Sequence, residues 1–354
     1  MSLIYNHVKS RNSAVELLRL ILMFLIVVGH CIMHGMGLIN LNPASHFPLT
    51  IPSDQMPFVS VAYGFCVCAV NCFVLISGYF GIKTTLKKIL YLIFALFFYS
   101  LIFNIIPQIA EHNFSGAITS LLILSHNPYW FVLIYLFLMV FAPLLNLAYE
   151  KMPQRSTDLF LIALIIISCY FGYLWNNNTN YDGYNLIQFI MMYCIGRKIR
   201  YSNFSLPKST SLIGFIICSV VCGISIYYAW LFGHPSRAWK CALYNNPIVI
   251  GSAIFLMLLF KNFQINSRTI NLISRSAFGI YLFQESLPVQ KLLYGYVADM
   301  SLHESGFRLT VIILTVSLIV CLIAIPLDAV RIYIYDKLLK FSTVHLPVRK
   351  KRSK

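Results

Sequence analysis

Residues 14–33 read AVELLRLILMFLIVVGHCIM, an apolar run interrupted by the side chains of Glu16, Arg19 and His30. A helix of about 20 apolar residues is long enough to cross the hydrocarbon core of a bilayer. The run has no small-residue cleavage site and is longer than the apolar part of a signal peptide, so we expect it to be retained. The stretch therefore predicts a membrane-spanning helix near the amino terminus.

Similar apolar runs recur along the chain of 354 residues. Hydrophobic residues make up 59% of the sequence and charged residues only 11%, whereas soluble domains carry about 25% charged residues. The sequence therefore predicts an all-α polytopic membrane protein with about ten transmembrane helices. We expect a single transmembrane domain at residues 1–340 and a basic tail at residues 341–354. The runs lie at residues 14–35, 57–80, 87–108, 128–148, 158–175, 184–199, 209–232, 243–261, 270–290 and 308–335.

The basic residues are distributed unevenly between alternate loops. The chain has 27 Lys and Arg residues and a net charge of +16. With a cytoplasmic amino terminus, the outer loops hold only Arg237, Lys240, Lys291 and Arg308. Membrane proteins keep Lys and Arg on the cytoplasmic side, so we expect both termini there. This distribution does not favour nucleic-acid binding, and we expect the tail Arg349–Lys354 to contact anionic lipid headgroups.

The ten cysteines lie almost entirely within apolar runs. No pair has the CxxC spacing and no set resembles a zinc site, so we expect them to pack as small apolar residues. His30 and His34 lie one helical turn apart and could share a metal ion. No carboxylate or thiolate near them in the sequence completes such a site, so we expect neither a metal nor a tightly bound cofactor.

Arg19 and His30 are ionisable residues inside an apolar run, where such residues are costly and often functional. They are eleven residues apart, and at about 100° per residue both side chains fall on one face of the helix. The two residues would lie about 16 Å apart along the axis and could line a path into the membrane. The alternatives are an arginine that snorkels to headgroups and a histidine that bonds to another helix. We expect Glu16 to cap the helix together with Ser13.

Polar residues also occur within and just after the second run. Asn71, Ser77 and Gly78 could support a site, or they could serve helix packing, which small and polar residues promote. The three lysines that follow the run could hold an anionic phosphate group or mark the cytoplasmic side. These lysines are Lys83, Lys87 and Lys88.

The fourth and ninth runs contribute further candidates. Trp130 opens the fourth run at the outer interface, where aromatic residues commonly form a belt. Gln284 and Glu285 lie near the outer end of the ninth run. We expect only Glu285 and Glu16, among the eleven acidic residues, to touch hydrocarbon. Glu285 is therefore the natural partner for His30 or for a substrate hydroxyl, unless it faces water.

Taken together, these segments resemble the acyltransferase-3 family of integral-membrane enzymes, which O-acylate surface sugars. Their order, their spacing and the ten-helix arrangement agree over nearly the whole chain. The chain has lysines where the family's basic segment is usually rich in arginine. It has Gln284 where histidine is frequent, so that role is lost or falls to Glu285. The matching segments are Arg19-x10-His30, Asn71 to Gly78 with the lysines after it, Tyr129-Trp130 to Asn146, and Phe278–Glu285.

The resemblance implies a bacterial cytoplasmic-membrane enzyme that takes an acyl group, usually acetyl, from acyl-CoA as co-substrate. It implies transfer to a hydroxyl of a cell-envelope glycan or of a lipid-linked saccharide. His30 would be the catalytic histidine, and Arg19 with the basic segment would hold the phosphates or the pantetheine arm of the donor. The histidine could remove the proton of the sugar hydroxyl or carry the acyl group covalently.

Two other functions suit a polytopic chain of this kind. A carrier or flippase for a lipid-linked sugar would show paired repeats and charged residues in several helices, and neither is evident in the sequence. A non-catalytic partner in a polysaccharide assembly complex would function without His30. The short outer loops carry no pattern that defines the acceptor glycan, the acyl chain length or the oligomeric state.

Overall fold

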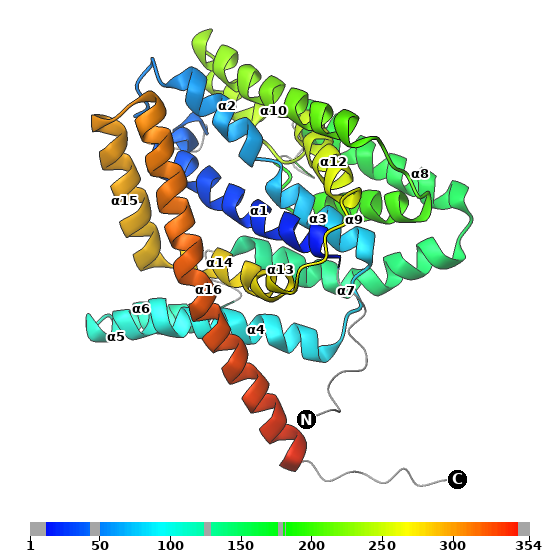
Figure 1. Cartoon of the computed structure of the whole chain (residues 1–354), viewed down its shortest axis with the longest axis vertical. Coiled ribbons are helices and arrows are strands. Elements are labelled where there is room, and N and C mark those ends of the chain that lie inside the picture. The colour runs from blue at the N-terminus through cyan, green and yellow to red at the C-terminus, as the bar shows by residue number, and fades with distance from the viewer. Residues whose placement is uncertain (1–11, 43–49, 124–128, 176–179, 181, 346–354) are drawn as a thin grey trace.

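The computed structural model of the chain describes residues 12–42, 50–123, 129–175, 180 and 182–345. Every regular element within these ranges is a helix, and the helices surround α1 (Ser13–His30) (Figure 1). The tail Arg349–Lys354, predicted to contact lipid, lies outside the described residues. The other α-helices are α2 (Met56–Cys66), α3 (Ala69–Phe80), α4 (Leu86–Ser100), α5 (Ile106–Ala110), α6 (Phe114–Leu121), α7 (Trp130–Lys151), α8 (Gln154–Ile165), α9 (Leu186–Tyr201), α10 (Lys208–Leu231), α11 (Pro235–Cys241), α12 (Pro247–Lys261), α13 (Arg268–Ile273), α14 (Ala277–Gln284), α15 (Leu287–His303) and α16 (Gly306–His345).

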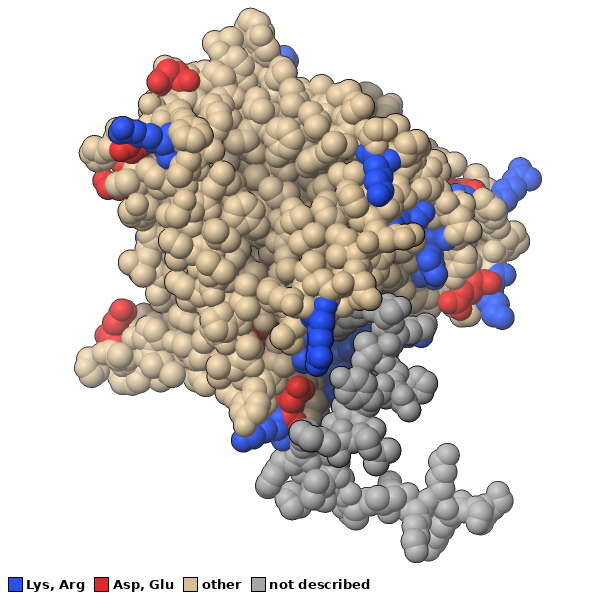
Figure 2. All heavy atoms as spheres, viewed as in Figure 1, with Lys and Arg blue, Asp and Glu red and all other residues tan. Residues whose placement is uncertain are grey.

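Seven helical runs within the described residues are long and apolar enough to cross a membrane. The other three predicted runs contain only shorter helices. One corresponds to α9, one to α12, and one to α13 together with α14. Figure 2 shows charged side chains mainly at the edges of the visible face, with a broad uncharged area between them. The chain is therefore an all-α polytopic membrane protein. The seven runs are Ser13–Gly35, Met56–Phe80, Leu86–Ala110, Trp130–Lys151, Gln154–Leu174, Lys208–Leu231 and Gly306–Leu339.

The central helix, α1, packs against α2, α3, α12, α14 and α16. Leu18, Leu22 and Val27 are fully buried at these contacts. In a bilayer, contacts between helices are stabilised by close packing and by interhelical hydrogen bonds, since lipid tails are as apolar as the side chains they surround. Because α1 contacts helices from both halves of the chain, its side chains can line cavities that those helices also line.

The amino-terminal end of α1 differs from the prediction. The cap is Asn12, whose side chain accepts a hydrogen bond from a backbone N–H of the first turn. The predicted cap formed by Ser13 and Glu16 is wrong. Ser13 Oγ instead accepts a hydrogen bond of 3.0 Å from the backbone N–H of Ser267, and Glu16 forms an ion pair of 2.9 Å with Arg19. Sequence spacing shows local partners only, and Ser267 is distant in the chain.

Two pairs of helices approach each other closely at glycines. A Cβ atom at Gly78 of α3 would collide with the backbone of Tyr193 in α9, and Gly196 of α9 is equally close to the backbone of α3. Gly64 of α2 and Gly223 of α10 meet in the same way. Small residues let membrane helices pack backbone to backbone. These contacts fix α3, which forms one wall of the site.

The predicted ninth span is not one continuous helix. α13, a 3-10 turn at Ser274–Ser276 and α14 follow one another, and the chain then leaves α14 at Glu285 and enters α15. Ser286 has an extended backbone, and Pro288 lies in the first turn of α15. Proline favours this position because an N–H there would have no partner within the helix. The break places Glu285 at the junction of two helices.

Candidate active site

The half-buried His30 and the buried Glu285 form a pair between α1 and the α14–α15 junction. Nδ1 of His30 lies 2.7 Å from Oε1 of Glu285. Gln284 and Gln290 donate hydrogen bonds of 2.9 Å and 2.8 Å to the two carboxylate oxygens, and Nε2 of Gln284 also lies 2.8 Å from Nδ1 of His30. A carboxylate partner favours the imidazole tautomer with its proton on Nδ1. The lone pair of the neutral ring is then on Nε2, where it can accept a proton.

The backbone widens into a π-helical turn directly after His30, at Cys31–Gly35. Such turns occur frequently at functional sites, and nothing in the apolar pattern indicates this one. The turn carries His34, whose ring lies 5.6 Å from that of His30 and 5.2 Å from that of Tyr294. Within the described part of the chain, no group of three or more His, Cys, Asp or Glu side chains could hold a metal ion.

A cavity of about 450 Å³ opens among α1, α3, α4, α7 and α14. Four cationic side chains line it, and no acidic residue of the described chain is among its lining residues. We name it the basic cavity. Its charge favours anionic ligands such as phosphates. The cations are Arg19, Lys83, Lys88 and Arg275.

A second cavity of about 570 Å³ lies on the other side of His30. One wall is aromatic: the ring centroids of Trp130 and Tyr184 are 4.7 Å apart, and those of Tyr184 and Tyr244 are 4.4 Å apart. We name it the aromatic cavity. The cavity therefore combines stacking surfaces with hydrogen-bonding groups. Its polar and ionisable lining includes His30, His34, Asn42, Asp182, Glu285 and Gln290.

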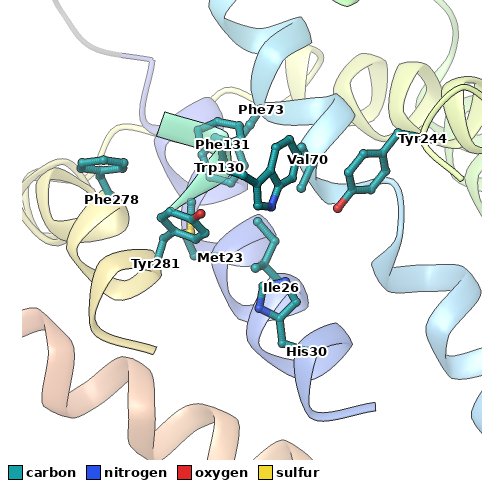
Figure 3. Close-up of a pocket in the computed structure, with 10 residues that line it drawn as sticks. All are labelled: Met23, Ile26, His30, Val70, Phe73, Trp130, Phe131, Tyr244, Phe278 and Tyr281. Carbon is teal, nitrogen blue, oxygen red and sulfur yellow. The ribbon is translucent and has the colours of Figure 1, made fainter. Parts of the chain in front are cut away.

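A narrow apolar cavity of about 20 Å³, here named the connecting cavity, has lining residues in common with each of the other two, and Figure 3 shows the residues that line it. It shares His30, Trp130 and Tyr244 with the aromatic cavity. It shares Met23, Phe73, Phe131 and Phe278 with the basic cavity. The three cavities are therefore neighbours: Arg19 lines the basic cavity, and His30 lines the connecting and aromatic cavities.

The predicted basic residues do not all reach the basic cavity. Arg19, Lys83 and Lys88 line it, whereas Lys87 is exposed and is not among its lining residues. The backbone carbonyl of Lys87 instead accepts a hydrogen bond of 3.0 Å from Tyr335. Arg275 also lines the cavity, and the sequence gives no sign of this because Arg275 is distant from Arg19 in the chain.

The predicted supporting residues of α3 each have a different role in the structure. Nδ2 of Asn71 donates a hydrogen bond of 2.8 Å to the carbonyl of Tyr244, and so holds an aromatic lining residue in place. Ser77 lines the basic cavity, and its hydroxyl lies 3.1 Å from that of Tyr135. Gly78 provides the close contact with α9. Tyr244 itself was missed, because its partners come from distant segments.

A second buried ion pair lies in α16. Arg331 Nε donates a hydrogen bond of 2.6 Å to Oδ1 of Asp328, and both side chains are fully buried. Nη2 of Arg331 donates a hydrogen bond of 2.8 Å to the hydroxyl of Tyr91, which lines the basic cavity. The prediction that only Glu16 and Glu285 among the acids enter the apolar region is therefore wrong. Asp328 is tolerated there because Arg331, one turn away, neutralises it.

The structure thus places a histidine–carboxylate pair beside neighbouring cavities within a polytopic helical bundle. Residues 12–325 match the family model of an acyltransferase domain, which defines the acyltransferase-3 family. The chain therefore belongs to this family. No curated protein and no solved structure matches the chain. The protein is a membrane acyltransferase.

Proposed function

We propose that this acyltransferase transfers an acetyl group from acetyl-CoA to a hydroxyl of a cell-envelope glycan or of its lipid-linked precursor. The position of His30 carries the proposal. Paired with Glu285, it lies where the connecting cavity meets the aromatic cavity. A donor from the basic cavity and an acceptor in the aromatic cavity can therefore meet at one imidazole. We place the enzyme in the cytoplasmic membrane of a bacterium, with the basic cavity towards the cytoplasm.

The basic cavity suits the donor. CoA carries phosphates at one end and the thioester at the end of a long flexible arm. Arg19, Lys88 and Arg275 can make charge-assisted hydrogen bonds to phosphate oxygens. The apolar connecting cavity excludes charged phosphates, because burying an unpaired charge is costly, and it has to widen before the uncharged arm can pass. Arg19 and His30 lie about 16 Å apart along α1, a span that the extended arm of CoA can bridge.

The centre can then act by general base catalysis. Nε2 of His30 accepts the proton of the acceptor hydroxyl as the oxygen attacks the thioester carbonyl carbon. Glu285 holds the proton on Nδ1 and stabilises the imidazolium that forms. The new carbon–oxygen bond forms and the carbon–sulfur bond breaks. The proton on Nε2 passes to the departing sulfur, so the products are an ester and free CoA.

The aromatic cavity suits a saccharide acceptor. The faces of Trp130, Tyr184 and Tyr244 offer flat surfaces for the apolar face of a sugar ring. Glu285 and Gln290 offer hydrogen-bonding groups for the ring hydroxyls on the polar wall. A mixed lining of this kind is typical of ligand sites, where apolar contact provides area and a few polar groups fix orientation.

The test is the O-acyl content of the surface glycans in a deletion strain. The strain is complemented with the wild type, with His30→Ala or with His30→Gln, and ester signals are recorded by NMR before and after mild alkali. We expect the esters to disappear on deletion and to return only with the wild type, while all three proteins reach equal abundance in the membrane.

Three other outcomes would contradict the proposal. If esters return with His30→Ala, the histidine is not catalytic. If the His30 variants are absent from the membrane, the residue serves packing. If the ester pattern never changes but less glycan reaches the surface, the chain acts in transport.

A further inference from the structure

The segment that joins α3 to α4, residues 81–85, forms part of the wall of the basic cavity. Gly81, Ile82 and Lys83 are among the lining residues of that cavity. We name the segment the α3–α4 loop. It has no regular secondary structure, so its backbone groups lack the partners that a helix would supply. Contacts with other helices therefore decide where the loop lies.

Both backbone groups of Ile82 are bonded to side chains of other helices. Its N–H donates a hydrogen bond of 2.9 Å to the hydroxyl of Tyr193 in α9, and its carbonyl accepts one of 2.9 Å from Nδ2 of Asn146 in α7. The hydroxyl of Tyr193 in turn donates a hydrogen bond of 2.7 Å to Oδ1 of Asn146. The three bonds form a closed hydrogen-bond cycle, in which each bond polarises the next and so strengthens it. The cycle joins the loop to α7 and α9 at one residue.

The loop is anchored again directly after Lys83. The hydroxyl of Thr84 donates a hydrogen bond of 2.5 Å to the carbonyl of Met139 in α7. Lys83 therefore lies between two anchored residues, Ile82 and Thr84. Its own carbonyl accepts a hydrogen bond of 2.7 Å from Nζ of Lys88, another cation of the basic cavity. The position of the loop thus affects both lysines of the cavity.

Tyr193 and Asn146 do not themselves line any of the described cavities. Tyr193 is fully buried, and a buried polar side chain is costly unless it is hydrogen-bonded. Its hydroxyl finds these partners in the loop and in Asn146. Both side chains can therefore affect a ligand in the basic cavity only through the loop that they hold.

We propose that Asn146 and Tyr193 are positioning residues for the donor, because they hold the α3–α4 loop where Lys83 and Lys88 can bind the phosphates of CoA. The proposal rests on the function proposed above and adds residues that set its donor affinity. Binding is weaker when a ligand must first order the segment that receives it. The hydrogen-bond cycle removes this cost, because it orders the loop before the donor arrives.

The test is Tyr193→Phe, which keeps the aromatic ring and removes the hydroxyl that makes two of the three bonds of the cycle. Purified full-length protein in detergent is given the ester-free glycan from the deletion strain and one of two donors. Acetyl-CoA carries the phosphates, whereas S-acetylpantetheine has the same thioester and arm but no phosphate. kcat and KM for each donor are measured from the rate of ester formation.

We expect Tyr193→Phe to raise the KM for acetyl-CoA about tenfold, the effect of weakening a hydrogen bond to a charged group, and to leave kcat within about twofold. Its kcat/KM for S-acetylpantetheine is expected to equal that of the wild type, because this donor has no phosphate for the lysines to bind. If Tyr193→Phe does not accumulate, Asn146→Ala breaks the same cycle and is expected to change the two donors in the same way.

The matched control is Tyr149→Phe, which removes a hydroxyl that also joins α7 to α9. This hydroxyl donates a hydrogen bond of 3.1 Å to the carbonyl of Cys194, which belongs to α9 and not to the loop. We expect the control to keep the wild-type KM for both donors, even if it unfolds at a lower temperature than the wild type. The comparison therefore separates positioning of the loop from packing of the two helices.

The two proposals fail in distinguishable ways. A wild type that forms no ester from acetyl-CoA overturns the proposed function. The positioning role is overturned if Tyr193→Phe keeps the wild-type KM for acetyl-CoA, if Tyr149→Phe raises that KM equally, or if Tyr193→Phe lowers kcat/KM by the same factor for both donors. It is also overturned if the wild type uses S-acetylpantetheine as efficiently as acetyl-CoA, since phosphate binding would then contribute nothing.

Discussion

At the residue scale, the carboxylate of Glu285 touches the imidazole of His30 and the amides of Gln284 and Gln290. Glu285→Gln preserves the size of the side chain but removes the charge that stabilises the imidazolium and fixes the proton on Nδ1. We expect ester formation to fall by about 10²- to 10⁴-fold, the usual contribution of a positioned acid or base. The measurement is the initial rate of acetyl transfer by purified protein.

The control for this substitution is Glu111→Gln, which makes the same chemical change at an exposed site. It is expected to transfer acetyl groups at the wild-type rate. A Glu285→Gln variant that folds and keeps more than about a tenth of the wild-type rate would show that the carboxylate does not assist the histidine.

Some of these residues can be found from sequence alone and others cannot. His30 and Glu285 can be recognised in the sequence because ionisable side chains are costly, and therefore rare, within membrane-spanning segments. The helical period predicts that Arg19 and His30 share one face, and in the structure they line neighbouring cavities. Gln290 lies only five residues after Glu285, and that proximity was the available signal. Tyr244 gave no signal, since its position depends on how distant helices pack.

At the scale of elements, the contact between α3 and α9 depends on Gly78. Gly78→Ala would press a methyl group into the backbone of Tyr193, which cannot move without shifting α9. We expect a loss of about 1–3 kcal/mol of stability, as for other overpacked sites. The measurement is the midpoint of thermal unfolding in detergent, followed by size-exclusion chromatography.

Gly295→Ala is the matched control for the α3–α9 contact. No described atom lies within 4 Å of a Cβ built at Gly295, which belongs to α15. Alanine favours helix over glycine, so this variant is expected to unfold at or slightly above the wild-type midpoint. A Gly78→Ala variant as stable as Gly295→Ala would contradict the close approach of α3 and α9.

Element boundaries were harder to predict than element positions. Each apolar run contains helix, but the ninth run breaks at Glu285 because Pro288 begins a new helix there. The composition of Cys31–Gly35 does not reveal the π-helical turn, because the same residues would suit an ordinary α-helix. Local sequence therefore places helices, and tertiary packing decides where they bend.

At the scale of the whole molecule, the number of spans decides where the termini lie. The ten predicted spans place both termini on one side, whereas the seven longest runs alone would place them on opposite sides. α9 has 16 residues and a length of about 24 Å, slightly less than the hydrocarbon core of a bilayer. Met191, Met192 and Tyr193 are fully buried, so other helices and not lipid surround the middle of α9. A helix enclosed in this way can belong to the membrane region even when it is short.

We therefore expect green fluorescent protein to fluoresce when fused to either terminus, because it folds in the cytoplasm but not after export in unfolded form. Alkaline phosphatase has the opposite requirement, and we expect it to be active when inserted at Gly233, in the turn after α10. The physical reason is the charge asymmetry, since 27 Lys and Arg residues are present and the outer loops hold only Arg237, Lys240, Lys291 and Arg308. Acetyl transfer by each fusion shows that its fold is intact. If an active carboxy-terminal fusion is dark while the amino-terminal fusion fluoresces, the chain crosses the membrane an odd number of times, and either one or all three of α9, α12 and the α13–α14 segment do not span it.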